Sequence, residues 1–243
     1  MFRRSAAALL TLLFTSGSAL ADPGYYVVTA YDNEGQRTLD LRYWTVKTPG
    51  EPATLWPEVG FGYGVTSRWY TELFASFIGT MDTAMKLSSW NWQNEVLLTQ
   101  GQYPFDLAIH ASLIKAAESY DGYALEIGPV FQTDIGRTQL NANLFFERSY
   151  QTSEPSPTQL KYQWQIKHRW HPALQFGLQG FGELGQWDHW APRDRQSHRA
   201  GPAIFGSVPI GGKQALLYQA AILKGQIYGS NGTMFSARVQ YAF

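Results

Sequence analysis

Polar and apolar side chains alternate with a period of two along most of this chain, and no stretch after residue 21 has the pattern of an amphipathic helix. The clearest run is residues 160–170. One of its faces is mostly apolar or aromatic and carries Leu160, Tyr162, Trp164, Ile166, His168 and Trp170. The other face carries only Lys, Gln and Arg. A period of two indicates a β-strand with two different faces, so the chain is predicted to be all-β.

The same alternation predicts twelve strands, at residues 39–47, 55–65, 69–79, 86–98, 104–115, 122–133, 137–148, 159–170, 173–184, 199–207, 213–224 and 233–243. Most are close to the ~9–11 residues that a tilted strand needs to cross a bilayer. Short connections alternate with longer loops, which include 79–85, 149–158 and 185–198. Alternating periplasmic turns and longer outer loops are typical of an outer-membrane barrel. We therefore predict a transmembrane antiparallel up-and-down β-barrel of twelve strands at residues 39–243.

The N-terminal segment has the features of a secretory signal peptide. Residues 1–21 combine a basic start, an apolar run at 6–14 and the small residues Ala19 and Ala21 before the expected cleavage site. Residues 22–38 are expected to form a periplasmic N-terminal lead-in, because one more crossing would spoil the even strand number of a bacterial barrel.

The composition excludes several other classes of protein. The 19 basic and 19 acidic side chains leave no net charge, whereas nucleic-acid binding calls for a basic patch or stripe. The absence of Cys excludes disulfide scaffolds and thiolate metal sites. The few Met and His residues are scattered, so no metal and no cofactor are predicted.

A secreted soluble sandwich or barrel is the alternative architecture, since its strands also alternate but turn their apolar face inward. Aromatic residues near strand ends, such as Trp69, Trp90 and Trp170, favour the membrane. They suit the aromatic girdle that outer-membrane barrels carry at each interface.

The end of the chain and several internal stretches resemble known outer-membrane proteins. The closing run VQYAF (239–243), with Tyr241 and Phe243, resembles the C-terminal signal that the barrel assembly machinery recognises. FGYGVTSRW (61–69), YQWQIKHRW (162–170) and FGELGQWDHWAP (181–192) resemble a group of uncharacterised proteobacterial outer-membrane β-barrel proteins. A weaker similarity is to the outer-membrane barrels of phenol-degradation pathways. The resemblance implies a bacterial outer-membrane location, with membrane lipid and the assembly machinery as partners, and it supplies no catalytic residue.

Charged residues on the polar faces form the first candidate site. A turn at 171–172 would place Lys161 opposite Glu183, and the same parity across the 149–158 loop would place it beside Glu147. Directly opposed unlike charges stabilise a sheet by roughly 0.2–1 kcal/mol. The predicted lumen charge ladder consists of Glu147, Lys161, Lys167, Arg169 and Glu183. It either fills a narrow lumen or forms a charged constriction that selects solutes.

Three glycines share one face of a predicted strand with Glu58, namely Gly60, Gly62 and Gly64. They are not a phosphate-binding fingerprint, because no helix pattern follows them. On an inward face they would leave room for bulky side chains opposite, or for a solute.

The connection at 185–198 is the second candidate site, and its most distinctive residues are Trp187, Asp188, His189 and Trp190. Asp188 beside His189 suggests a catalytic triad with Ser149 or Ser197, but no nucleophile motif marks either serine, and no catalytic residue is predicted. Function concentrates in loops on rigid scaffolds. The loop is therefore expected on the outer face, as a gate or plug over the lumen or as a partner-binding surface.

Together these features favour an outer-membrane conduit for a small solute that the sequence does not identify. Two alternatives stay open. One is an outer-membrane enzyme that acts on lipid or protein through the 185–198 loop. The other is a structural or adhesion barrel with a closed lumen.

The predicted location and fold can be tested by fractionation. The protein is expected in the outer-membrane fraction, and unboiled samples should migrate differently from boiled samples on a denaturing gel, because a closed barrel resists unfolding by detergent. Recovery as a soluble periplasmic protein would contradict the assignment.

Overall fold

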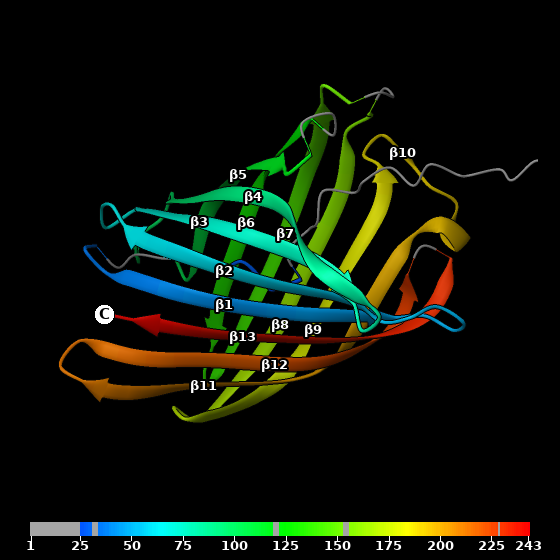
Figure 1. The fold of residues 1–243 in the computed structure, drawn as a ribbon. Helices are drawn as coiled ribbons and strands as arrows, with labels where there is room; N and C mark the ends of the chain where they lie inside the picture. The colour runs from blue at the N-terminus through cyan, green and yellow to red at the C-terminus, as the bar shows by residue number, and fades with distance from the viewer. Residues whose placement is uncertain (1–24, 31–33, 119–121, 153–155, 228) are drawn as a thin grey trace, which may run out of the picture.

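The computed structural model describes residues 25–30, 34–118, 122–152, 156–227 and 229–243, in which twelve long antiparallel strands form one closed barrel (Figure 1). The predicted signal peptide, 1–21, lies outside these residues. No helix in the described part of the chain is long and apolar enough to span a membrane. The long strands are β1 (Arg37–Lys47), β2 (Thr54–Gly64), β3 (Trp69–Thr80), β4 (Thr83–Leu97), β5 (Phe105–Ala116), β6 (Tyr123–Ile135), β7 (Thr138–Tyr150), β8 (Gln159–His171), β9 (Leu174–Gln186), β11 (Ser197–Gly211), β12 (Gln214–Ile227) and β13 (Ser230–Ala242).

The barrel closes where the first strand meets the last. β1 pairs with β13 along its whole length, and each remaining long strand pairs with the strands before and after it. At the end of this seam, Arg37 and Phe243 exchange two backbone N–H···O hydrogen bonds of 2.9 Å each. Closure removes the unpaired edges that hydrocarbon would not tolerate. The predicted all-β barrel of twelve strands is therefore confirmed.

The polar faces of the strands point inward. Asn143 and Gln165 are buried inside the barrel, whereas Leu144, Ile166 and Phe235 on the opposite face are 48%, 40% and 39% exposed. This is the reverse of a soluble barrel, whose apolar faces form the core. An apolar outer wall is the surface that lipid requires.

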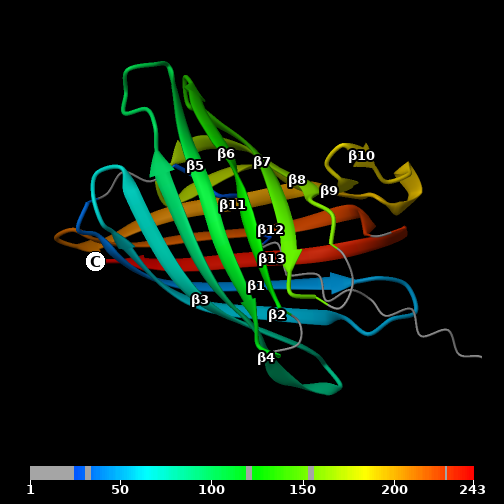
Figure 2. The ribbon, with the colours of Figure 1, turned by 90° about the horizontal axis from the view of Figure 1, so that it is seen from above.

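The connections between strands lie at two opposite ends of the barrel, here called the turn end and the loop end (Figures 1 and 2). The turn end, which also holds Arg37 and Phe243, carries the connections at 65–68, 98–104, 136–137, 172–173 and 212–213. The loop end carries the connections at 48–53, 81–82, 117–122, 151–158, 187–196 and 228–229.

The prediction of a long loop at 79–85 is wrong, because only Met81 and Asp82 separate β3 from β4. The Thr83 hydroxyl accepts the Thr80 backbone N–H at 2.9 Å, and the Thr80 hydroxyl accepts that of Asp82 at 3.2 Å. These short side-chain bonds replace a loop with a tight turn.

Residues 25–30 run inside the barrel, which differs from the periplasmic lead-in expected at 22–38. Tyr25 and Val27 pack against one wall of the lumen, with Trp44 and Phe181. Tyr26 and Val28 pack against another part of the wall, formed by residues of β4–β7. All four N-terminal side chains are buried. This short segment has the same period of two as a strand, but both of its faces meet protein because it is surrounded by the barrel.

Because the apolar faces of the strands point outward, an added charge should destabilise the protein much more on the outer wall than in a turn at the rim. Leu144→Arg places a charge on the lipid face and should lower the free energy of unfolding from lipid vesicles by roughly 2–4 kcal/mol. Met81→Arg, in the tight turn at the loop end, should cost less than about 1 kcal/mol, because the turn lies at the rim. Equal losses in the two variants would contradict the assignment of the outer face.

Candidate functional site

The lumen is lined by ionisable side chains from almost every strand. The fully buried ones are Asp40, Arg42, Glu58, Glu72, Glu95, His110, Glu126, Glu147, Lys161, Glu183, Arg199 and Arg238. Burial of a charge is costly unless the charge is paired and hydrogen-bonded. The positions of these side chains are therefore determined by their pairing, which divides them into three groups.

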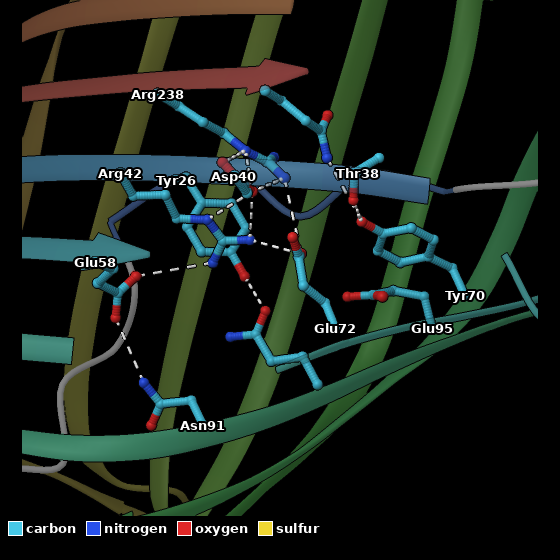
Figure 3. Close-up of polar contacts among 12 residues, drawn as sticks. Tyr26, Thr38, Asp40, Arg42, Glu58, Tyr70, Glu72, Asn91, Glu95 and Arg238 are labelled. Carbon is cyan, nitrogen blue, oxygen red and sulfur yellow. Dashed lines mark hydrogen bonds and ion pairs between the residues drawn. The ribbon is translucent and has the colours of Figure 1, made fainter. Parts of the chain in front are cut away.

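The first group surrounds Arg42 on β1 (Figure 3). Its guanidinium lies 3.0 Å from Asp40 Oδ2, 2.9 Å from Glu72 Oε2 and 3.9 Å from Glu58 Oε2. Arg238 on β13 also contacts Asp40, at 2.5 Å. Two arginines and three carboxylates from four strands thus share one network across the seam of the barrel.

Two aromatic rings enclose Arg42. Its guanidinium carbon lies 3.5 Å from the ring centroids of both Tyr26 and Phe74. Phe74 can reach this position because β2 has glycine at residue 60, where a Cβ would lie 2.3 Å from the Phe74 ring. Tyr70 similarly covers Gly62, with its hydroxyl 2.0 Å from the Cβ position. Bulky side chains of β3 therefore occupy the space that two of the inward glycines leave.

The second group surrounds Lys161 on β8. Its Nζ lies 2.5 Å from Glu147 Oε2 and 3.5 Å from Glu126 Oε2. His110 joins this group, with Nδ1 3.1 Å from Glu95 Oε1 and Nε2 3.4 Å from Glu126 Oε1. The group crosses five adjacent strands, β4 to β8.

The register around Lys161 agrees with the predicted hairpin on one side and is shifted on the other. Lys161 lies opposite Glu183 on β9, but opposite Phe145 instead of Glu147 on β7. A shift of two residues keeps every side chain on the same face. Lys161 and Glu147 therefore still meet, along a diagonal of the ladder.

The third group joins Arg199 on β11 to Glu183 on β9. The Arg199 guanidinium lies 2.7 Å from Glu183 Oε1 and 4.4 Å from the ring centroid of Tyr25. The Tyr25 hydroxyl donates a hydrogen bond of 3.1 Å to the same Glu183 oxygen. The N-terminal segment is thus part of this charge group as well as of the Arg42 group.

Uncharged side chains also hold the N-terminal segment. Val28 N–H donates to Gln163 Oε1 at 3.1 Å, and the Val28 carbonyl accepts from Asn143 Nδ2 at 2.9 Å. The Tyr26 hydroxyl donates to Gln93 Oε1. Sequence reasoning missed Tyr25 and Tyr26 as site residues. The only local signal was the short run of aromatic and β-branched residues, which suggested a possible strand without showing that it would enter the lumen.

The remaining residues of the predicted ladder lie toward the turn end. Arg169 forms a bidentate pair with Asp134, at 2.9 and 3.0 Å, in which the two side chains are 40% and 46% exposed. This rim pair is separate from the three buried groups. Lys167 lines a cavity of about 170 Å³ together with Val27 and Thr29 of the N-terminal segment.

The 185–198 loop stands at the loop end, where it includes the two-residue strand β10 (His189–Trp190) and a 3-10 turn at Arg193–Arg195 (Figure 2). Trp187 and Trp190 are both more than half exposed, and Trp187 packs edge-on against Phe146 on the outer wall. Asp188 accepts a hydrogen bond from Gln186 at 2.8 Å. These contacts place the two tryptophans outside the lumen.

At the opposite end, the rings of Tyr241 and Phe243 stack with their centroids 5.2 Å apart. Phe243 completes the backbone bonds of the seam with Arg37. The proposed assembly signal therefore lies at the point where the barrel closes.

No protein-family model matches this chain, and no curated protein matches it in sequence. Several solved structures match in shape. The NanC porin is 9% identical, with 84% of this chain and 98% of the porin covered and a TM-score of 0.59. An outer-membrane channel from Pseudomonas putida F1 is 10% identical, with 91% of this chain and 98% of the channel covered and a TM-score of 0.61. The KdgM porin is 8% identical, with 85% of this chain and 99% of the porin covered and a TM-score of 0.56.

The chain has the outer-membrane β-barrel fold. The neighbours, the closed ladder and the apolar outer wall agree on this point. The match covers nearly the full length of these neighbours.

Two cations of β8, Lys161 in a buried ion pair and Arg169 in an exposed one, are predicted to differ in how much their substitution destabilises the protein. Lys161→Gln leaves Glu126 and Glu147 without their shared cation and should lower the free energy of unfolding by about 3–5 kcal/mol. Arg169→Gln removes an exposed pair and should cost less than about 1 kcal/mol. Urea unfolding in lipid vesicles measures both. The double variant Lys161→Gln with Glu147→Gln should recover part of the loss, and no recovery would contradict direct pairing.

Proposed function

We propose that this protein is an outer-membrane conduit for small solutes whose lumen is closed, in this conformation, by its own residues 25–30. The observation that carries the proposal is that residues 25–30, which precede β1 in the chain, lie inside the barrel and pack against its inner wall. The lumen is therefore filled by this segment together with the side chains of the wall. The channel neighbours share the fold and are consistent with such a role.

The wall of the barrel does not need the segment in order to stay closed. The backbone ladder runs continuously from β1 to β13 and back to β1, and residues 25–30 are not part of it. Withdrawal of the segment would break contacts with Arg42, Arg199 and Glu183 and the hydrogen bonds to Gln93, Gln163 and Asn143. It would break no strand pairing. Water would then hydrate the exposed charges and offset part of the loss.

The charged lumen suits a hydrophilic path. A barrel that serves only as a structural element has no need of so many buried ionisable groups, since each one carries a desolvation cost. In an open conduit the same groups would meet water, and their pairing would determine which ions and solutes pass. The predicted ladder residues Glu147, Lys161 and Glu183 would then contribute to selectivity.

We propose two partners besides the solute. The apolar outer wall fits membrane lipid, as the fold implies. The ring pair Tyr241 and Phe243 is proposed as the signal for the barrel assembly machinery, because it lies at the closing seam, where the last strand is held to the first.

Removal of the closing segment should open the pore. A variant that lacks residues 25–30 is expected to show stepwise ionic current in planar lipid bilayers, with much higher conductance than the full chain. A variant that lacks residues 188–195 is the control and should conduct like the full chain, because that loop lies outside the lumen. A folded 25–30 deletion that carries no current would instead favour the closed structural barrel.

A further inference from the structure

One cation of the lumen has no carboxylate partner. Arg42, Lys161, Arg199 and Arg238 each form an ion pair with a carboxylate. In the part of the barrel that the structure describes, Lys167 forms none. Its partners in the strand register are Gln139 on β7 and Gly177 on β9, and neither carries a charge.

The nearby carboxylates are already paired with other cations. Asp40 is paired with Arg238, which lines the same cavity, and with Arg42. Asp134 is held by both guanidinium nitrogens of Arg169 at the rim. The Lys167 ammonium instead lies 5.8 Å from the ring centroid of Phe205. The cavity therefore has one positive charge in excess.

The lining of the cavity divides into polar and apolar parts. Four glutamine side chains line it, namely Gln165, Gln175, Gln219 and Gln240. The amides of Gln165, Gln175 and Gln240 already donate hydrogen bonds within the protein. Among the described residues, the Gln219 side chain has no hydrogen-bond partner, so its amide is available to a ligand. Val27, Phe205 and Leu217 supply an apolar surface.

The volume of the cavity indicates the size of the group that it can surround. It measures about 170 Å³, and an apolar cavity of about 150 Å³ is large enough to hold benzene. A single six-membered ring with one small polar substituent therefore fits. One uncompensated cation matches one negative charge, and the apolar surface disfavours an inorganic anion that keeps its water shell.

We propose that this cavity is a binding site for a small monocarboxylate with an apolar body. The carboxylate binds Lys167 Nζ and the Gln219 amide, and the apolar body packs against Val27 and Phe205. A charge-assisted hydrogen bond in a partly buried site is stronger than a neutral one, so the ligand is recognised mainly by its charge. The site lies at the turn end and does not depend on whether the barrel conducts.

Titration calorimetry on the full chain refolded in detergent tests the proposal with benzoate as the probe. Benzoate should bind saturably with a stoichiometry of one, and benzamide, a neutral analogue of the same shape, should bind at least about tenfold more weakly. Lys167→Gln should weaken benzoate binding by a similar factor and abolish the preference for benzoate over benzamide. Lys213→Gln, which removes an exposed lysine from the connection at 212–213 at the same end of the barrel, is the matched control and should bind benzoate like the unmodified protein.

Three results would overturn the proposal: no saturable binding of benzoate, equal binding of benzoate and benzamide by the unmodified protein, or unchanged binding by a folded Lys167→Gln variant. The benzamide comparison needs no variant, so it decides the matter even if Lys167→Gln fails to refold. Binding is measured without a current, which separates this outcome from the conductance experiment.

Discussion

A backbone that crosses hydrocarbon has to satisfy every N–H and C=O group within the protein, because the bilayer core offers no other partner. In this chain the requirement is met by a ladder that closes on itself between β1 and β13, with Arg37 and Phe243 bonded to each other at its end. Closure divides the side chains of each strand into those that face lipid and those that face the lumen. The composition of the interior follows from that division.

The interior is narrow, so the side chains that face it are buried and their charges have to find partners. They do so across sequence distances that no local pattern connects: Arg238 reaches Asp40 over the seam, and Lys161 reaches back to Glu126. Aromatic rings add to this pairing where a cation has a free face, as Tyr26 and Phe74 do for Arg42. The N-terminal segment therefore contacts two of the charge groups, through Tyr26 at Arg42 and Tyr25 at Arg199 and Glu183.

The position of the closing element changes the functional interpretation of the barrel. From the sequence, the loop at 185–198 was the candidate for a gate or plug, because tryptophan, histidine and aspartate are concentrated there. In the structure Trp187 lies on the outer wall, while Tyr25 and Tyr26 occupy the lumen. The proposed gate would have a simple physical advantage, since a segment outside the strand ladder could move without breaking the pairing that keeps the wall intact.

The sequence by itself determined the all-β class, the number of strands and which face of each strand is polar, because period-two alternation is a local property of each strand. It also placed Lys161 on one face with Glu147 and Glu183, since parity survives a register shift of two residues. Tertiary structure alone decided that Lys161 also meets Glu126, that Arg169 pairs at the rim, and that Lys167 has no carboxylate beside it. It also decided the location of residues 25–30. Their contacts are with the inner surface of the barrel, and that surface exists only after strands distant in sequence have closed into a ring.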